Sequence, residues 1–330
     1  MKVFRILLSI LLILVLLAGI FVFCIYNLMQ SPSGDLKEYK LSVPSGVSYF
    51  SVSQDLENNG IIKNAKVFYY YSRYKQANLK SGVYTVNNEM SFDELHTLLN
   101  TGKQEYITVS IPEGFTISTV AKLLEEKGVT SSRDFIETAK DASFISQFNI
   151  PSTTLEGYIF PDTYYFTPEM NAEDVLEIMV GNFYEKLSTI ENADSLSAKE
   201  LHEVVKLASI VEKEYKVASE APLIASVFKN RLRYNIGLYS CATIIYIITE
   251  VQGLPHPGVV KYTDTKIDSP YNTYLYAGLT PTPISNPGLV ALDAAINTPK
   301  TNYYFFRVKD EAKGTHIFTT DLESHIEAGL

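Results

Sequence analysis

Apolar and polar residues follow three patterns along this chain, and the first is an unbroken apolar run near the amino terminus. Ile6 to Met29 carries no charged residue and consists mainly of Leu, Ile, Val, Phe and Ala. At about 1.5 Å per residue, a helix of this length crosses a hydrocarbon core of about 30 Å. Lys2 and Arg5 precede the run, and basic residues on the short side indicate that this side is cytoplasmic. We expect residues 1–30 to be a cytoplasmic tip and a retained single-pass anchor, with the remaining chain outside the cytoplasm.

A cleaved signal peptide is the alternative interpretation of this run. The run is longer than the roughly 7–15 apolar residues of a signal peptide, and no small-x-small cleavage site follows it. Cys24 is preceded by Phe-Val-Phe, where a lipoprotein signal would have small residues. Ser31-Pro-Ser-Gly34 then reads as a short linker between the membrane and the first domain.

The second pattern combines period-two strand signals with short amphipathic helices. Gly and Pro residues lie at the ends of these segments. Ser91-Phe-Asp-Glu94 has the form of a capping box at a helix start. We predict a strand at 39–43, helices at 48–59 and 65–75, a strand at 82–86, and a helix from 91 to about 100.

This pattern occurs a second time. Val43-Pro-Ser-Gly-Val47 matches Ile111-Pro-Glu-Gly-Phe115 at a shift of 68 (111 − 43). Tyr84-Thr-Val86 matches Tyr164-Tyr-Phe166 at a shift of 80 (164 − 84), so the second copy carries 12 extra residues (80 − 68). We interpret the two copies as related βααβα units, at about 38–103 and 106–187. Chance similarity between amphipathic helices is the alternative.

The extra residues and their flanks are rich in aromatic side chains. The segment from Leu155 to Tyr165 reads Leu-Glu-Gly-Tyr-Ile-Phe-Pro-Asp-Thr-Tyr-Tyr and contains Glu156 and Asp162. Aromatic faces beside carboxylates suit a wall that binds sugars, and a packed turn with buried tyrosines is the alternative.

The third pattern is a longer amphipathic helix with one carboxylate on its apolar side. Ser197-Ala-Lys-Glu200 is a capping box, so we expect the helix to begin there and to end near Lys216. At 100° per residue, Glu212 falls in the middle of the apolar stripe. The stripe contains Leu201, Val204, Val205, Ala208, Val211 and Tyr215, and the opposite side contains Glu203, Lys206, Lys213 and Glu214.

An inward carboxyl such as Glu212 has two interpretations. Burial makes the carboxyl hold its proton more tightly, which a general acid working near neutral pH requires. A structural carboxylate, paired with an arginine or capping another helix, is the alternative.

The remainder of the chain mixes a helix, a long irregular region and a small α/β end. Many Pro and Gly residues between 234 and 290 exclude extended regular structure from most of this region, which is typical of a binding or active-site feature. We predict a helix after Ser219, a short helix at 289–296, strands at 303–308 and 315–318, and a helix at 321–328. The fold class is therefore α+β with a mainly helical second domain.

Composition narrows the function classes. A net charge of −9 over 330 residues, without a basic patch, argues against a nucleic-acid partner. Cys24 and Cys241 are the two cysteines, and no intrachain disulfide is expected between an anchor residue and an outer domain. His202-Glu-Val-Val-Lys206 has lysine where a zincin has its second histidine, so we expect no metal and no cofactor.

Several ordered blocks resemble one known family. They are Leu155–Tyr164, Leu207-Ala-Ser-Ile-Val-Glu-Lys-Glu214, Val217–Glu220, Val227-Phe-Lys-Asn-Arg-Leu232, Ser269-Pro-Tyr-Asn-Thr-Tyr274, Gly278-Leu279, Asn286-Pro-Gly-Leu289 and Gly314-Thr-His-Ile-Phe318. Together they resemble the MltG (YceG-like) endolytic murein transglycosylases, from about residue 38 to the end of the chain.

The resemblance implies a LysM-like peptidoglycan-binding unit at 38–104 and a catalytic domain at 105–330. It implies that Glu212 is the catalytic acid and base, which cleaves the bond between N-acetylmuramic acid and N-acetylglucosamine and leaves 1,6-anhydro ends. Peptidoglycan strands, the cytoplasmic membrane and peptidoglycan synthases are the implied partners. The residues expected to bind substrate are Glu156, Asp162, Asn230, Ser240, Thr243, Tyr271, Asn272 and Thr273.

The chain departs from the family pattern at one place. Where the family commonly has Gln-Ser-Asp-Pro/Ala-Thr, this sequence reads Tyr239-Ser-Cys-Ala-Thr243, so an amide and a carboxylate are missing. A non-catalytic scaffold that binds peptidoglycan and a hydrolase of the same substrate are the alternative functions. A hydrolase would ordinarily need a second carboxylate, for which Asp162, Glu220 and Asp268 are the candidates.

Overall fold

The structure is a computed structural model that describes residues 2–32, 34–44, 46–102 and 106–329, with side chains described from residue 10 onward. Its first helix, α1 (Lys2–Met29), contains the apolar segment Ile10–Met29, which is long enough to cross a bilayer and is compatible with a single-pass membrane anchor. The chain divides into two compact units, Met1–Tyr106 and Ile107–Leu330. The mixed α+β class with a mostly helical body is confirmed.

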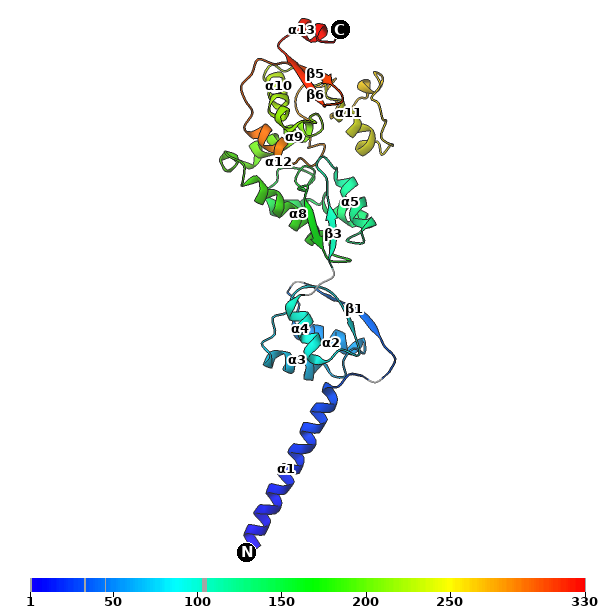
Figure 1. Ribbon diagram of the computed structural model, residues 1–330, viewed down its shortest axis with the longest axis vertical. Helices are drawn as coiled ribbons and strands as arrows, with labels where there is room; N and C mark the ends of the chain where they lie inside the picture. Colours follow the sequence, from blue (N-terminus) through cyan, green and yellow to red (C-terminus); the bar gives the residue numbers. More distant parts are fainter. Residues whose placement is uncertain (1, 33, 45, 103–105, 330) are drawn as a thin grey trace. The chain divides into compact units, whose positions relative to one another are not determined.

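After α1, the first unit packs three helices on one strand pair. Strands β1 (Glu38–Val43) and β2 (Gly82–Asn87) are antiparallel, and α2 (Tyr49–Asn58), α3 (Ala65–Tyr74) and α4 (Phe92–Thr101) complete the βααβα order (Figure 1). The expected capping box of Ser91 and Glu94 is present at the start of α4. Leu41, Leu56, Phe68 and Tyr84 are fully buried in its core, because each lies on the inner face of its strand or helix.

The second unit opens with the same arrangement of elements. Strands β3 (Ile107–Ser110) and β4 (Thr163–Phe166) are antiparallel, and α5 (Ile117–Glu126), α6 (Ser132–Thr138) and α8 (Ala172–Leu187) follow the order of the first unit. The 12 extra residues fall between α6 and β4, where the chain forms α7 (Ala142–Ile145), the 3₁₀ turn η1 (Ser146–Phe148) and a loop.

The strand registers of the two units coincide at the shifts seen in the sequence. Tyr39 pairs with Val86, and adding 68 and 80 gives Ile107 and Phe166, which also pair. The hydroxyls of Tyr84 and Tyr164 each donate to the carbonyl four residues earlier, both at 2.6 Å. A repeat that keeps register and a side-chain bond is not expected from chance similarity of amphipathic helices.

The rest of the second unit is built on three helices. Helix α12 (Leu289–Ile296) packs against α9 (Ala198–Val211) and α10 (Ala221–Arg233), and a hairpin of β5 (Phe305–Asp310) and β6 (Thr315–Thr319) follows before α13 (Leu322–Glu327) (Figure 1). Ala208, Ala291 and Ala295 are fully buried. Their small side chains let α9 and α12 approach closely, and this contact brings the start of α12 toward the end of α9.

Helix α9 begins at the predicted capping box but ends earlier than predicted. Its last residue is Val211 rather than a residue near Lys216, and Glu212 is the C-cap. The Glu214 amide donates to the Val211 carbonyl at 3.0 Å, three residues back, which tightens the last turn. Glu214 therefore lies beyond the regular helix, and the expectation that it lies on the solvent side is wrong: Glu214 is partly buried.

One other expectation about α9 needs correction. Lys206 was expected on the polar side of α9, but it is largely buried, with its ammonium 2.6 Å from Glu203. Most of the region 234–290 is irregular, as predicted, and it contains one helical segment, in which α11 (Cys241–Tyr246) continues directly into the π-helical turn η4 (Ile247–Val251). An apolar run, Ile244 to Ile248, gives this segment a buried face and so allows a helix.

Candidate active site

The site is centred on Glu212, which lies where α9 meets the start of α12. Its Oε2 atom accepts a hydrogen bond from the backbone N–H of Gly288 at 2.9 Å, and Gly288 is the N-cap of α12. The Tyr215 hydroxyl lies 3.4 Å from both carboxylate oxygens. Glu212 is half-buried, so the carboxyl is held by the protein and still reachable from solvent.

Burial raises the pKa of Glu212 from its usual value of 4.5 to about 7. The hydrogen bonds from Gly288 and Tyr215 and the charge of Lys213 oppose this rise, and the negative charge of Glu113 adds to it. A carboxyl with a pKa near 7 is protonated in part of the molecules at neutral pH. It can therefore both donate and accept a proton, as a general acid and base must.

A tight turn between β3 and α5 forms the facing side of the site. The Gly114 amide donates to the Asn286 carbonyl at 2.9 Å, and the Asn286 amide donates to the Phe115 carbonyl at 2.9 Å. These paired bonds hold the turn against the loop before α12. Gly114 has a φ of +75°, in the left-handed region that favours glycine. The turn therefore lies against Glu212 and Lys213, which are close to the Gly114 α-carbon.

Asn286 connects this turn to a second buried carboxyl. Its Nδ2 donates to the Phe115 carbonyl at 2.9 Å and to Glu156 at 3.0 Å. Its Oδ1 accepts from the amides of Gly157 at 2.8 Å and Ile159 at 3.0 Å. One fully buried side chain thus makes four hydrogen bonds, and it ties three segments of the chain together near Glu212.

Glu156 lies at the amino end of α5. Both of its oxygens accept from the Ile117 amide at 3.1 Å, a favourable position for a negative group. Burial nevertheless raises the pKa of Glu156 to about 8. The sequence predicts a substrate-binding role for Glu156, and the structure gives its carboxyl two partners inside the protein.

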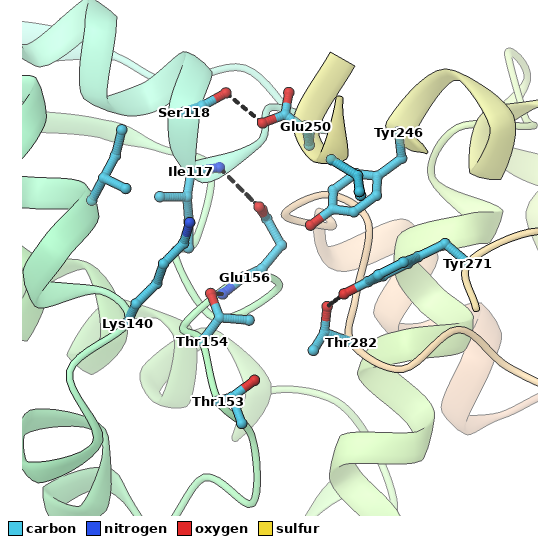
Figure 2. Close-up of a pocket in the computed structure, with 12 residues that line it drawn as sticks. Ile117, Ser118, Lys140, Thr153, Thr154, Glu156, Tyr246, Glu250, Tyr271 and Thr282 are labelled. Atoms are coloured by element: carbon cyan, nitrogen blue, oxygen red, sulfur yellow. Dashed lines mark hydrogen bonds between the residues drawn. The ribbon is translucent and has the colours of Figure 1, made fainter. Parts of the chain in front are cut away.

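A pocket of about 260 Å³ adjoins Glu156, between the start of α5 and the turn η4 (Figure 2). Glu250 lies on its η4 side and accepts bonds from the hydroxyls of Thr116 and Ser118. Tyr271, another predicted substrate-binding residue, lines the pocket and shares a 2.8 Å bond with Thr282 (Figure 2). Hydroxyls, carboxyls and aromatic faces in one pocket are the groups that bind a sugar.

The structure places three other predicted binding residues in internal contacts. Asp162 is 3.0 Å from the Lys186 ammonium and accepts a bond from Asn182. The side-chain amide of Asn230 donates to the carbonyls of Thr301 and Tyr303, and that of Asn272 donates to the carbonyls of Thr265 and Ile267. Each of these side chains holds a loop in position.

Three predicted hydroxyl residues form a cluster with Glu214 instead of Glu212. Thr243 and Thr273 share a 2.9 Å hydroxyl contact, and the Ser240 amide donates to the Thr273 hydroxyl at 3.2 Å. The Ser240 hydroxyl donates to the Glu214 carboxylate. Burial raises the pKa of Glu214, and this hydrogen bond opposes the rise.

Two residues near Glu212 were not identified from the sequence. Glu113 lies in the Pro-Glu-Gly turn that was used only to define the repeat, and Asn286 lies in a block used only for the resemblance. At the position matching Glu113 the first copy has Ser45. This difference between the two copies is the sequence feature that could have identified Glu113. Within the described ranges, no three His, Cys, Asp or Glu side chains are grouped so that they could hold a metal ion.

The other two candidates for a second carboxylate are engaged elsewhere. Glu220 accepts from the backbone amide of His316 at 3.1 Å, and its Oε2 lies 2.7 Å from the His316 ring nitrogen. Asp268 accepts from the Tyr276 hydroxyl at 2.8 Å. Of the carboxylates considered, Glu113 is the one that adds its charge to the surroundings of Glu212.

Comparison with known proteins gives a consistent group of relatives. The model of the YceG-like family matches residues 41–329. A Bacillus subtilis protein named endolytic murein transglycosylase is 32% identical over 305 residues, which cover 87% of this chain and 83% of that protein. A Streptococcus pneumoniae protein of the same name is 29% identical over 326 residues, and this chain spans 59% of its length.

A solved structure is also similar. The crystal structure of a YceG-like protein from Listeria monocytogenes is 29% identical to this chain, with a TM-score of 0.56. The match covers 89% of this chain and 99% of the Listeria chain. The similarity therefore includes both units of the fold.

Proposed function

Because the chain belongs to the YceG-like family, we propose that it is an endolytic murein transglycosylase, a lyase that cuts the glycan strands of peptidoglycan. The observation that carries this proposal is Glu212, a half-buried carboxyl with a pKa of about 7 at the junction of α9 and α12. A scaffold protein has no need of a proton donor in this position.

In the proposed reaction one carboxyl acts twice. Protonated Glu212 gives its proton to the oxygen that links N-acetylmuramic acid to N-acetylglucosamine, and the bond from that oxygen to the muramic C1 breaks. The resulting Glu212 carboxylate then takes the proton of the muramic C6 hydroxyl while O6 bonds to C1. The 1,6-anhydro ring closes, Glu212 is protonated again, and no water is consumed.

We expect the rate of cleavage to fall as the pH rises through about 7. The first step needs the protonated form of Glu212, and the pKa of about 7 places its loss of the proton there. Initial rates of cleavage by the full chain in detergent, measured between pH 5 and pH 9, test this. A rate that keeps rising to pH 9 would contradict the assignment of Glu212 as the acid.

Helix α1 and the unit at 38–104 also fit a peptidoglycan substrate. We propose that the apolar segment of α1 anchors the protein in the cytoplasmic membrane with the amino terminus inside, so that both units face the peptidoglycan. The unit at 38–104 is proposed to be LysM-like and to bind glycan. Cleavage of nascent strands beside the membrane would end their elongation, with peptidoglycan synthases as partners.

Product analysis separates the candidate functions. Uncrosslinked glycan strands are incubated with the full chain in detergent, and the new ends are identified by mass. Anhydromuramyl ends support the transglycosylase, whereas the absence of cleavage would favour a binding scaffold. Reducing ends would indicate a hydrolase, a candidate favoured by Glu113, since hydrolases ordinarily use a second carboxylate.

A further inference from the structure

The Glu113 carboxylate lies directly against the backbone of Gly288. A Cβ atom added to Gly288 would overlap the Glu113 carboxylate. The amide of this same glycine donates to Glu212 at 2.9 Å. The two carboxyl groups therefore approach one residue, and the absence of a side chain on Gly288 allows Glu113 to come this close.

The surroundings of Glu113 leave it open to a ligand. The side chain is exposed, and no hydrogen bond or ion pair to its carboxylate occurs in the described part of the chain. Its backbone is nevertheless fixed, because the neighbouring Gly114 and Phe115 are both bonded to Asn286. Glu113 therefore has a fixed backbone position and a carboxylate that is free to contact a ligand.

The repeat provides an equivalent turn for comparison. Pro44 and Val47 in the first unit line a surface pocket of about 480 Å³, and their counterparts in the second unit are Pro112 and Phe115. In the second unit this turn packs on the loop before α12, and it carries Glu113 where the first copy has Ser45. The two copies of the turn thus differ by a carboxylate, which is present in the copy that contacts the site.

We propose that Glu113 is a second functional carboxylate of the site, which contacts the muramic sugar at the cleavage point and keeps the proton on Glu212. The proposal rests on the transglycosylase function above. An exposed negative charge beside Glu212 makes loss of its proton less favourable. The same charge stabilises the positive charge that develops at C1 when the glycosidic bond breaks.

The other groups around Glu212 favour loss of its proton. Lys213 favours the ionised form, although its ammonium also donates to the Gly114 carbonyl at 3.2 Å. Tyr215 donates a hydrogen bond and likewise favours the ionised form. The start of α12 contributes the Gly288 amide. Glu113 is thus the charged side chain that favours the protonated acid.

Glu113→Gln tests the proposal in the full chain in detergent, with kcat and KM for uncrosslinked glycan strands measured from pH 5 to pH 9. We expect kcat to fall about 10²-fold, the lower end of the range for loss of one group that stabilises a developing charge. The loss of rate at high pH should begin at a lower pH, because the pKa of Glu212 falls when the negative charge is removed. Glu113→Asp keeps the charge and should restore the wild-type pH profile. Glu126→Gln, which alters an exposed carboxylate of α5, should change neither.

The experiment distinguishes an error in the role of Glu113 from an error in the transglycosylase function. If the wild-type chain makes no anhydromuramyl ends, the function itself is wrong. If it does so and Glu113→Gln keeps the wild-type kcat and pH profile, the role of Glu113 is overturned. Should the glutamine variant unfold, Glu113→Ser, which introduces the residue of the first copy, replaces it, and an unchanged profile in that variant overturns the proposal equally.

Discussion

Glu212→Gln is expected to lower the rate of glycan cleavage by about 10²–10⁴-fold, the range that general acid catalysis supplies. Glutamine has nearly the same shape and can still accept the bond from the Gly288 amide, but it has no proton to give to a leaving oxygen. Since burial raises the pKa of this carboxyl, the variant should be at least as stable as the wild type. Cleavage rate and thermal unfolding of the full chain in detergent measure both effects.

The control for this variant needs a carboxylate outside the site. Glu214 is not suitable, because it is partly buried and accepts a bond from Ser240, so its loss would disturb the neighbouring loop. Glu177 on α8 is exposed, and Glu177→Gln should leave the rate unchanged. Cleavage at the wild-type rate by Glu212→Gln would exclude this carboxyl as the proton donor and leave it a structural role.

Asn286→Ala is expected to destabilise the second unit by about 3–5 kcal/mol, since each buried polar group left unpaired costs about 1–3 kcal/mol. The substitution removes the acceptor of the buried Gly157 and Ile159 amides. The Phe115 carbonyl and Glu156 each lose one bond but keep another, from the Asn286 backbone amide and from the Ile117 amide. For a unit of this size we expect the midpoint of thermal unfolding to fall by about 10 °C. Calorimetry or circular dichroism of the full chain in detergent measures the shift.

Asn302 provides the matched control for this prediction. It is exposed, and its side chain makes no hydrogen bond within the described residues, so Asn302→Ala should change the free energy of unfolding by less than about 0.5 kcal/mol. Equal unfolding midpoints for the two variants would mean that Asn286 does not hold the three segments together.

The repeat and the start of α9 could be predicted from the sequence because both depend on local patterns. Strand pairing follows from alternation and from the spacing of Pro and Gly, so the shifts of 68 and 80 already contain the register of β3 and β4. The capping box at Ser197 fixed where α9 begins. From there, periodicity directed Glu212 inward and distinguished it from the exposed Glu203.

The helical period no longer predicts the direction of side chains beyond the end of α9. Glu214 lies beyond the regular helix, which ends at Val211, and it is partly buried against the expectation from the helical wheel. The predicted polar residues Asn230 and Asn272 have side-chain amides that bond to backbone carbonyls of distant or irregular segments. A helix or strand period does not predict such bonds, because the partners of Asn230 are more than 70 residues away and those of Asn272 lie in an irregular loop.

The sequence alone determined the elements, the repeat and the inward position of Glu212, since each of these follows from residues close together in the chain. Only the tertiary structure decided what surrounds that carboxyl. Glu113 and Gly288 are 175 residues apart (288 − 113), and they meet because Asn286 pairs the β3–α5 turn with the start of α12. The pKa of an acid depends on such neighbours and on burial, and both are properties of the folded chain.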